Sequence, residues 1–376
     1  MKKALKIVLI VLGSIGLLIG ILYLTGNSYL PRGVYCTYLH GKSKPDIDDL
    51  SLFHTRKINR GEAINLPAKL KVLSNENVAF LNSTESEAFL VFKNDTLVSE
   101  WYGHLGADTT HWNSFSMAKS FISMLIGCAI EEGKITSLND PISKYISWNS
   151  KDVTIEQLLH MSSGIPFGES YNSPFGYMAK AYYGSDLKSI TAPFQVEQTP
   201  GSYWSYEGGN TVLLGMVLEA ATQKNISNYF EEKIWSKIGA SSSAYWNLDK
   251  ENGFEKPFTG VYATAKDFAM LGQCILHDGK VNETVVLDSA FLAESFEPWT
   301  IQDRNNSVCN WYGLHWWMGE VDGVKFKSAR GMRGQYIVML PEKNMVIVRI
   351  GHQQSKERID HMPVDLLTYI RMGLSL

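Results

Sequence analysis

A serine and a lysine stand three residues apart in Ser116-Met117-Ala118-Lys119, at the start of an apolar stretch. On a helix, residues i and i+3 share a face, so this amine can reach this hydroxyl. A buried lysine amine loses its proton more readily than an exposed one, which suits it to act as a base. A serine in the first helical turn also presents its own N–H to a developing oxyanion. The pair predicts nucleophilic catalysis, with Ser116 as nucleophile and Lys119 as its base.

The spacing alone has little specificity, because Ser185 and Lys188 repeat it. That second pair lies in a polar stretch with no apolar helix behind it, and we assign it no function. For Ser116 the alternative interpretation is an ordinary serine at a helix start, beside a solvated lysine. The apolar run Phe121–Ile130 predicts a buried helix directly after the pair and therefore favours catalysis.

A tyrosine supplies the third candidate group. Tyr206 lies in a glycine-rich turn that leads into a predicted helix, within the segment 200–215. A phenol in such a turn can project into a cleft, and beside an ammonium it can serve as a general base. The alternative is a packed loop tyrosine, one of 18 tyrosines in the chain.

Other chemistries find little support in the sequence. It contains neither H-E-x-x-H nor G-x-S-x-G, which argues against a zinc hydrolase and an α/β-hydrolase. Gly41-Lys42-Ser43 lacks the leading glycine and strand of a phosphate-binding loop. The nine histidines are scattered, and a formal net charge of -3 gives no electrostatic case for nucleic acid. We expect no metal, no organic cofactor and no histidine base.

The elements that must position these groups can be predicted along the chain. Residues 88–92 and 97–102 form a hairpin, and 116–132 form a helix closed by Gly133. Helical patterns dominate from 138 to 241, interrupted by a Gly/Ser/Tyr/Pro-rich loop at 162–185. Residues 335–340 and 345–350 form a second hairpin, and 356–371 form a closing helix. Strands from both ends, with helices between them, indicate one sheet assembled from distant segments.

The amino terminus is a separate feature. The uncharged run from Ile7 to Leu24 makes a helix of roughly 27 Å, close to the ~30 Å hydrocarbon core of a bilayer. Lys2, Lys3 and Lys6 precede it, which favours a cytoplasmic tail and an exported body. A cleaved signal peptide is the alternative, but no A-x-A pattern follows the run. We expect a cytoplasmic tail at 1–6, a transmembrane signal anchor at 7–24, a tether and N-terminal segment at 25–85 and a hydrolase domain at 86–376.

These residues resemble a known family, the serine β-lactamase and penicillin-binding protein superfamily. Within it, class C-like esterases and 6-aminohexanoate-dimer hydrolases look most similar. The resemblance covers about residues 85–352 and rests on five segments in a fixed order. They are Ser116–Lys119, Leu138-Asn-Asp-Pro141, the segment 154–164, the segment 200–215 and Gly331-Met-Arg-Gly-Gln335.

The resemblance implies both a fold and roles for the candidate residues. The fold is α/β (α+β): a mostly antiparallel sheet with helices on both faces, plus an all-helical subdomain, with the active cleft between them. Ser116 is then the nucleophile, Lys119 activates it, and Tyr206 is base or proton relay. The backbone N–H groups of Ser116 and Met332 form the oxyanion hole. No metal or cofactor is required.

Two family motifs depart from their usual form. The tyrosine motif is usually Tyr-x-Asn, whereas here it reads Tyr206-Glu207-Gly208, with Asn210 nearby. The third motif, a basic residue followed by Thr/Ser and Gly, has its remnant either in Lys327-Ser328-Ala329 or at Gly331-Met332. The basic residue that grips a substrate carboxylate therefore stays open between three candidates, which are Lys327, Arg330 and Arg333. The predicted pocket residues are Tyr171, Asn210, Trp316, Lys327, Arg330 and Gly331, with Phe175 as a further wall.

The sequence thus predicts a single-pass, membrane-anchored serine hydrolase that cleaves small amides or esters through an acyl-Ser116 intermediate. Its partners are the small-molecule substrate and the membrane, with its catalytic domain on the exported side. One alternative is a D-Ala-D-Ala peptidase or β-lactamase, which the altered motifs disfavour. Another is a tethered covalent sensor that acylates but does not turn over.

Overall fold

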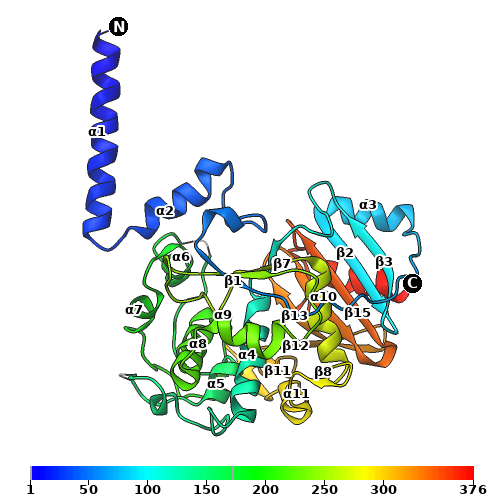
Figure 1. Cartoon of the computed structure of the whole chain (residues 1–376). Coiled ribbons are helices and arrows are strands. Elements are labelled where there is room, and N and C mark those ends of the chain that lie inside the picture. The colour runs from blue at the N-terminus through cyan, green and yellow to red at the C-terminus, as the bar shows by residue number, and fades with distance from the viewer. Residues whose placement is uncertain (1, 149, 172) are drawn as a thin grey trace.

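A six-stranded antiparallel sheet forms the centre of the computed structural model, which describes residues 2–148, 150–171 and 173–376 (Figure 1). Its strand order is β12-β13-β14-β15-β2-β3. The strands β2 (Ser86–Lys93) and β3 (Thr96–Tyr102) come from the N-terminal half of the chain. The other four are β12 (Trp317–Val321), β13 (Val324–Gly331), β14 (Gln335–Leu340) and β15 (Met345–Gly351). Both predicted hairpins, and the assembly of one sheet from the two ends, are confirmed.

Both faces of this sheet are buried, because side chains alternate between two cores. On β2, Leu90 and Phe92 belong to one core, whereas Phe89 and Val91 belong to the other. Helices α4 (Met117–Glu131) and α10 (Ala265–Leu276) pack on the first face. Helices α3 (Asn75–Ser83) and α12 (Val364–Leu374) cover the second. The closing helix begins later than predicted because the short strands β16 and β17 and Pro363 precede it.

The helical part lies beside the first core. It contains α5 (Ile155–Leu159), α6 (Tyr177–Tyr183), α7 (Leu187–Thr191), α8 (Gly208–Thr222) and α9 (Ile226–Phe230). Helix α4 packs against α8, so it is covered by the sheet on one side and by helices on the other. Its residues from Met117 to Ala129 are all buried, as the apolar run predicts, and Gly133 ends it with a φ of 67°.

A second sheet supports the start of α4. Its order is β1-β6-β7-β4, made of β1 (Thr55–Ile58), β6 (Ala244–Asn247), β7 (Val261–Ala263) and β4 (Trp112–Asn113). The remaining elements are short: β5 (Tyr203–Trp204), β8 (Lys280–Val281), β9 (Thr284–Val285), β10 (Ile301–Asp303), β11 (Val308–Cys309), β16 (Arg358–Ile359), β17 (Met362–Pro363), α11 (Ser289–Ser295), the 3-10 turns η1 (Tyr38–His40), η2 (Leu50–Leu52), η3 (Ile142–Lys144) and η5 (Pro341–Lys343), and the π-helical η4 (Glu231–Trp235).

The amino-terminal helix α1 (Lys2–Leu24) stands away from the body (Figure 1). By length and composition it is apolar enough to cross a membrane. The segment 25–85, predicted as a tether and N-terminal segment, contacts the body through three of its elements. Helix α2 (Tyr29–Cys36) contacts α6, β1 pairs with β6, and α3 lies on β2. Short polar segments of this kind gain their structure from docking, which periodicity does not reveal.

Four cysteines, Cys36, Cys128, Cys274 and Cys309, are free and buried. Burial raises the pKa of the Cys128, Cys274 and Cys309 thiols to about 12. A thiol held in its protonated form is a poor nucleophile, so these three cysteines serve as core residues.

Candidate active site

Ser116 and Lys119 are in direct contact at the start of α4. Lys119 Nζ donates a hydrogen bond to Ser116 Oγ at 3.0 Å and another to the Phe258 carbonyl at 3.1 Å. The lysine is 1% exposed, so the surrounding side chains exclude water from its amine. Ser116 remains partly accessible and lines a cavity. The contact that the i, i+3 spacing predicts is therefore present.

The turn that delivers Ser116 is strained and tightly held. Phe115 has a φ of 44°, a left-handed conformation that is unusual for a bulky residue. Its N–H donates to Asn113 Oδ1 at 2.8 Å, which fixes the turn between β4 and α4. Ser114 makes two hydrogen bonds to Val261 on β7, from its own N–H at 2.7 Å and to its Oγ at 3.1 Å. The second sheet therefore fixes the backbone that leads into the nucleophile.

The end of β13 lies directly against this turn. A Cβ added to Gly331 would lie 2.3 Å from the Ser114 carbonyl oxygen, so only glycine permits the approach. Met332, the next residue, lines the same cavity as Ser116. Arg333 then has a φ of 64° and turns the chain into β14. This proximity suits Met332 for the predicted role of second oxyanion donor.

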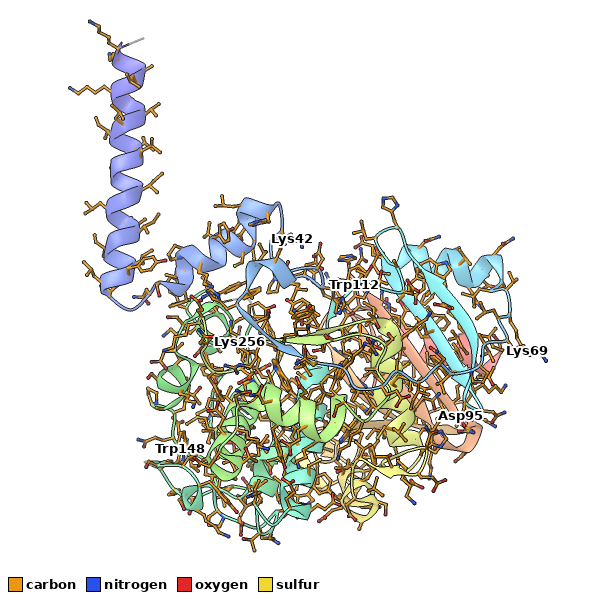
Figure 2. All side chains as sticks on the ribbon, in the orientation of Figure 1. Lys42, Lys69, Asp95, Trp112, Trp148 and Lys256 are labelled. Atoms are coloured by element: carbon orange, nitrogen blue, oxygen red, sulfur yellow. The ribbon has the colours of Figure 1, made fainter. Side chains whose placement is uncertain are left out.

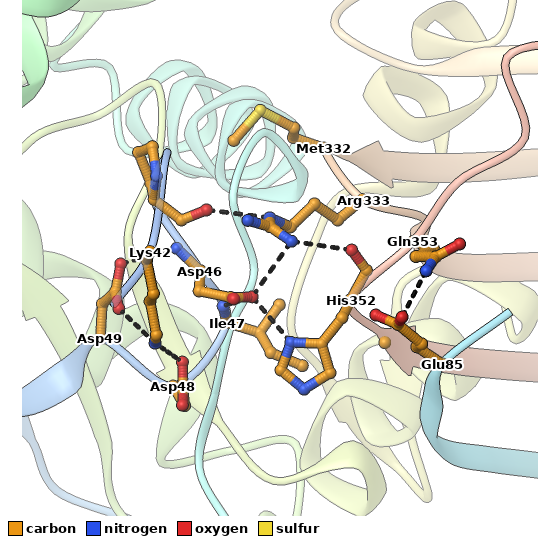
Figure 3. Close-up of polar contacts among 12 residues, drawn as sticks. Lys42, Asp46, Ile47, Asp48, Asp49, Glu85, Met332, Arg333, His352 and Gln353 are labelled. Atoms are coloured by element: carbon orange, nitrogen blue, oxygen red, sulfur yellow. Dashed lines mark hydrogen bonds and ion pairs between the residues drawn. The ribbon is translucent and has the colours of Figure 1, made fainter. Parts of the chain in front are cut away.

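An ionic cluster fastens the Met332 turn to the amino-terminal segment (Figure 3). Asp46 Oδ1 accepts a hydrogen bond from His352 Nδ1 at 2.8 Å and lies 3.5 Å from Arg333 Nη1. Arg333 also donates to the Pro45 carbonyl at 2.9 Å and to the His352 carbonyl at 2.8 Å. Burial acts against it, but the Asp46 carboxylate raises the pKa of His352. Arg333 is thus used in positioning this turn.

Tyr206 reaches the lysine from the helical part. Lys119 Nζ lies 4.9 Å from the centre of the Tyr206 ring. An aromatic cluster holds this ring, with Trp317 at 5.5 Å and Tyr312 perpendicular to it at 6.3 Å. The predicted trio of Ser116, Lys119 and Tyr206 therefore gathers around one amine, although Tyr206 lies far from the other two residues in sequence.

Two carboxylates near Tyr206 were not predicted as site residues. Glu169 accepts a hydrogen bond from the first N–H of α8, that of Gly208, at 2.6 Å, and another from the Tyr171 hydroxyl. Glu207 is 3% exposed, and burial together with the Glu169 carboxylate raises its pKa. Their signal in the sequence was faint. Glu169 lies in the loop predicted at 162–185 and belongs to none of the motifs, and Glu207 is only the middle residue of the degenerate motif Tyr206-Glu207-Gly208.

The other predicted pocket residues separate into two groups. Tyr171 lines the cavity with Ser116 and Met332, and Gly331 supports it from behind. The other four are not among the described residues that line the cavity, and each packs elsewhere. Asn210 accepts from Ser163 Oγ, Arg330 lies over the Trp317 ring, Lys327 lies over the Phe296 ring at 3.9 Å, and Trp316 packs against Phe296. Phe175 is exposed on the loop that follows Tyr171.

A buried histidine near the site has a different use. His315 Nδ1 donates to the Leu159 carbonyl at 2.8 Å, and Nε2 accepts from Thr211 Oγ1 at 3.0 Å. Burial lowers the pKa of His315 to about 3, so the ring is neutral. With both nitrogens occupied, it joins α5 to α8. Within the described residues, no group of three or more His, Cys, Asp or Glu side chains is arranged to hold a metal ion.

Comparison with known proteins identifies the family of this chain. The Beta-lactamase family model matches residues 82–368. The chain belongs to the beta-lactamase family. The family resemblance inferred from its motifs, and the fold class inferred with it, are thereby confirmed.

The relatives are distant but cover most of the chain. It is 23% identical to the 6-aminohexanoate-dimer hydrolase of Paenarthrobacter ureafaciens, over 72% of this chain and 74% of that protein. It is 26% identical to the teichoic acid D-alanine hydrolase of Staphylococcus aureus, over 68% and 64%. Among solved structures, a Bacillus anthracis protein named after 6-aminohexanoate-dimer hydrolase superposes with a TM-score of 0.74 at 21% identity, covering 88% of this chain and 92% of that one. A family VIII carboxylesterase gives 0.61 at 16% identity, covering 83% and 99%.

Proposed function

We propose that this protein is a serine hydrolase that cleaves an amide or ester bond of a small molecule through an acyl-Ser116 intermediate. The observation that carries the proposal is the 3.0 Å contact between Lys119 Nζ and Ser116 Oγ, at the edge of a cavity that reaches the hydroxyl. Hydrogen-bond reach between base and nucleophile is the first geometric requirement of this chemistry. Membership of a hydrolase-rich family supports it.

The proposed reaction has two halves, and each balances its protons. Ser116 Oγ attacks the carbonyl carbon as the neutral amine of Lys119 takes the hydroxyl proton. The resulting oxyanion is stabilised by the backbone N–H groups of Ser116 and Met332. As the tetrahedral intermediate collapses, the proton passes by way of Tyr206 to the departing alcohol or amine. Water then attacks the acyl-enzyme with the same groups acting as base, which releases the acid and restores Ser116.

We further propose that α1 anchors the protein in a membrane with the catalytic domain on the exported side. The three lysines that precede the apolar run, Lys2, Lys3 and Lys6, support this orientation. Flotation of the full chain with phospholipid vesicles tests the anchor. Protection of a tag placed before residue 6 from external protease in sealed cells tests the orientation.

A hydrolysis panel tests the chemistry. The full chain in detergent is assayed against p-nitrophenyl acetate, nitrocefin, a D-Ala-D-Ala peptide and a linear ω-amino amide, each repeated with Ser116→Ala. We expect Ser116-dependent turnover of the ester or the amide. Unchanged turnover in the variant would overturn the mechanism. Nitrocefin or peptide hydrolysis exceeding all others would replace the substrate class, and a single burst without turnover would indicate a covalent sensor.

A further inference from the structure

The cavity above Ser116 has an unusual wall. Its volume is about 440 Å³, within the ~300–1,000 Å³ typical of small-molecule sites. One side is formed by α6 and the loop before it, including Tyr171, Met178 and Ala179. The opposite side is formed by α2 and the residues after it, including Val34 and Tyr38. The segment that follows the membrane-span-length helix therefore builds part of the catalytic cavity.

This wall is docked onto the body. Tyr29 is 4% exposed and Cys36 is 1% exposed, so both ends of α2 are buried. A Cβ on Gly33 would come within 3.2 Å of the Tyr183 ring, which shows how closely α2 lies on α6. The cluster around Asp46 then fixes the following residues to the Met332 turn (Figure 3). The position of α2 over the cavity is thus maintained from both sides.

The rim of the cavity is apolar and exposed. Val34 and Tyr38, which line the cavity, are both exposed. Exposed apolar side chains also follow lining residues directly in the sequence: Tyr35 and Leu39 on the α2 side, and Phe175 after Pro174. A group of exposed large apolar side chains marks a contact with a membrane or a partner. Here α1 ends at Leu24 and α2 begins at Tyr29, so the helix that forms one side of the cavity directly follows the helix that we propose as the anchor (Figure 1). That continuity favours the membrane.

The cavity lies on the side of Ser116 where the acyl part of a substrate would bind. Phe115, Ser116 and Met332 line it, whereas Tyr206 is absent from its described lining. In the proposed mechanism the leaving group departs towards Tyr206, and the carbonyl oxygen lies at Met332. The part of the substrate that enters the cavity is therefore the acyl part. Largely apolar walls suit a hydrocarbon chain there.

From this geometry we infer that the substrate is a membrane lipid ester or amide whose long acyl chain enters the cavity between α2 and α6 from the bilayer surface. This inference rests on the proposed function and specifies its substrate class. The acyl chain of the lipid passes along the apolar rim. The carbonyl carbon thereby reaches Ser116 without full transfer of the lipid through water. Ser116 then carries the fatty acyl group until hydrolysis.

Chain-length selectivity tests the cavity. The ratio of kcat/KM for p-nitrophenyl decanoate to that for the acetate is measured for the full chain in detergent, and we expect it to exceed 10. Val34→Trp and Ala179→Trp fill the cavity from opposite walls and are each expected to lower this ratio at least tenfold. Val285→Trp is the matched control, because Val285 is 50% exposed against 47% for Val34 and lies on β9, outside the cavity lining. It should leave the ratio unchanged.

Two results distinguish the failure of this inference from failure of the proposed function. Ser116-dependent acetate hydrolysis with no preference for decanoate, or with the same ratio in both tryptophan variants, overturns the lipid substrate alone. Acetate hydrolysis that persists in Ser116→Ala overturns the proposed function itself.

Access from the bilayer has its own test. The full chain is reconstituted in phosphatidylcholine vesicles, and p-nitrophenyl palmitate is placed either in the same vesicles or in a separate population. We expect initial hydrolysis at least tenfold faster when enzyme and ester share a bilayer. Equal rates in the two arrangements would contradict entry from the membrane surface.

Discussion

Gly331 lies against the carbonyl of Ser114, two residues before the nucleophile, at a distance that leaves no room for a side chain. Gly331→Ala should push the end of β13 away from the turn, because a Cβ would lie 2.3 Å from the carbonyl oxygen. We expect the free energy of unfolding to fall by about 1–3 kcal/mol, as for other overpacked sites. The rate of p-nitrophenyl acetate hydrolysis should fall further than this loss of stability explains, because Met332 moves with the strand.

Urea unfolding and steady-state kinetics on the same samples measure both effects. Gly16→Ala is the control, since nothing lies within 4 Å of the position that its Cβ would take. Full activity in Gly331→Ala would mean that the contact has no part in positioning Met332.

Replacing Lys119 by Met removes the amine but keeps an unbranched chain in the same buried space. We expect kcat to fall by about 10²–10⁴-fold, the usual contribution of a general base. Lys188→Met is the matched control, because Lys188 has the same spacing from a serine but pairs with Glu219 at the surface. Trapping of the acyl-enzyme by mass spectrometry should succeed in the original protein and fail in Ser116→Ala. Equal losses in both lysine variants would refute a special role for Lys119.

Tyr206→Phe separates the phenol from the ring that carries it. The ring packs against Trp317 and Tyr312, and phenylalanine keeps those contacts. We therefore expect an unfolding midpoint close to the original and a kcat lower by about 10²–10⁴-fold. Tyr203→Phe, at an exposed tyrosine of the neighbouring strand β5, should change neither quantity. A Tyr206→Phe enzyme with full kcat would exclude the hydroxyl from proton transfer.

Lys256 should make stability depend on pH. It lies in the packed body (Figure 2), over the rings of Phe53 and Tyr182. Burial lowers the pKa of Lys256 from 10.5 to about 7. Between these two values the unfolded chain binds the extra proton, so this residue makes the fold more stable as pH rises from 7 to 10.5. The 3.5-unit difference corresponds to about 5 kcal/mol at most.

Lys256→Met removes the titrating group, and its effect is read as a difference between two proteins. We expect the variant to gain stability over the original as pH falls from 10 to 7, by several kcal/mol in total. Urea unfolding at four pH values in this range measures the trend. Other titrating groups are shared by both proteins and cancel in the comparison. A constant difference across the range would show that Lys256 remains charged in the folded protein.

Much of the fold and the trio around Lys119 were predictable from the sequence, for local physical reasons. An apolar run and a terminal glycine predict the helix that carries Ser116. The contact between Ser116 and Lys119 follows from their i, i+3 spacing on that helix and depends on no distant part of the sequence. The hairpins at 86–102 and 335–351 have apolar strand runs separated by turn residues. Placement of Tyr206 relied on resemblance, because its distance from Lys119 depends on how α8 packs against α4.

The features that could not be predicted from the sequence depend on packing between segments far apart in the chain. Lys327 and Trp316 are basic and aromatic residues near a family motif, yet both pack against Phe296. The segment 29–58 is polar and has no regular spacing of apolar residues. Its helix and strand therefore could not be predicted without knowledge of the surfaces that they contact. Glu169 lies in an irregular loop, and only the N-terminus of α8 gives its carboxylate a place.

The assembly of the central sheet from both ends of the chain has a consequence for biosynthesis. Met332 and the strands β14 and β15 are among the last parts to leave the ribosome, whereas α1 and Ser116 emerge early. Pairing between β2 and β15 joins segments far apart in sequence, and long-range strand pairing of this kind is slow to form. A nascent chain therefore carries its serine and lysine without the turn that completes the site. The site around Ser116 can therefore be completed only after the last strands of the sheet have been synthesised.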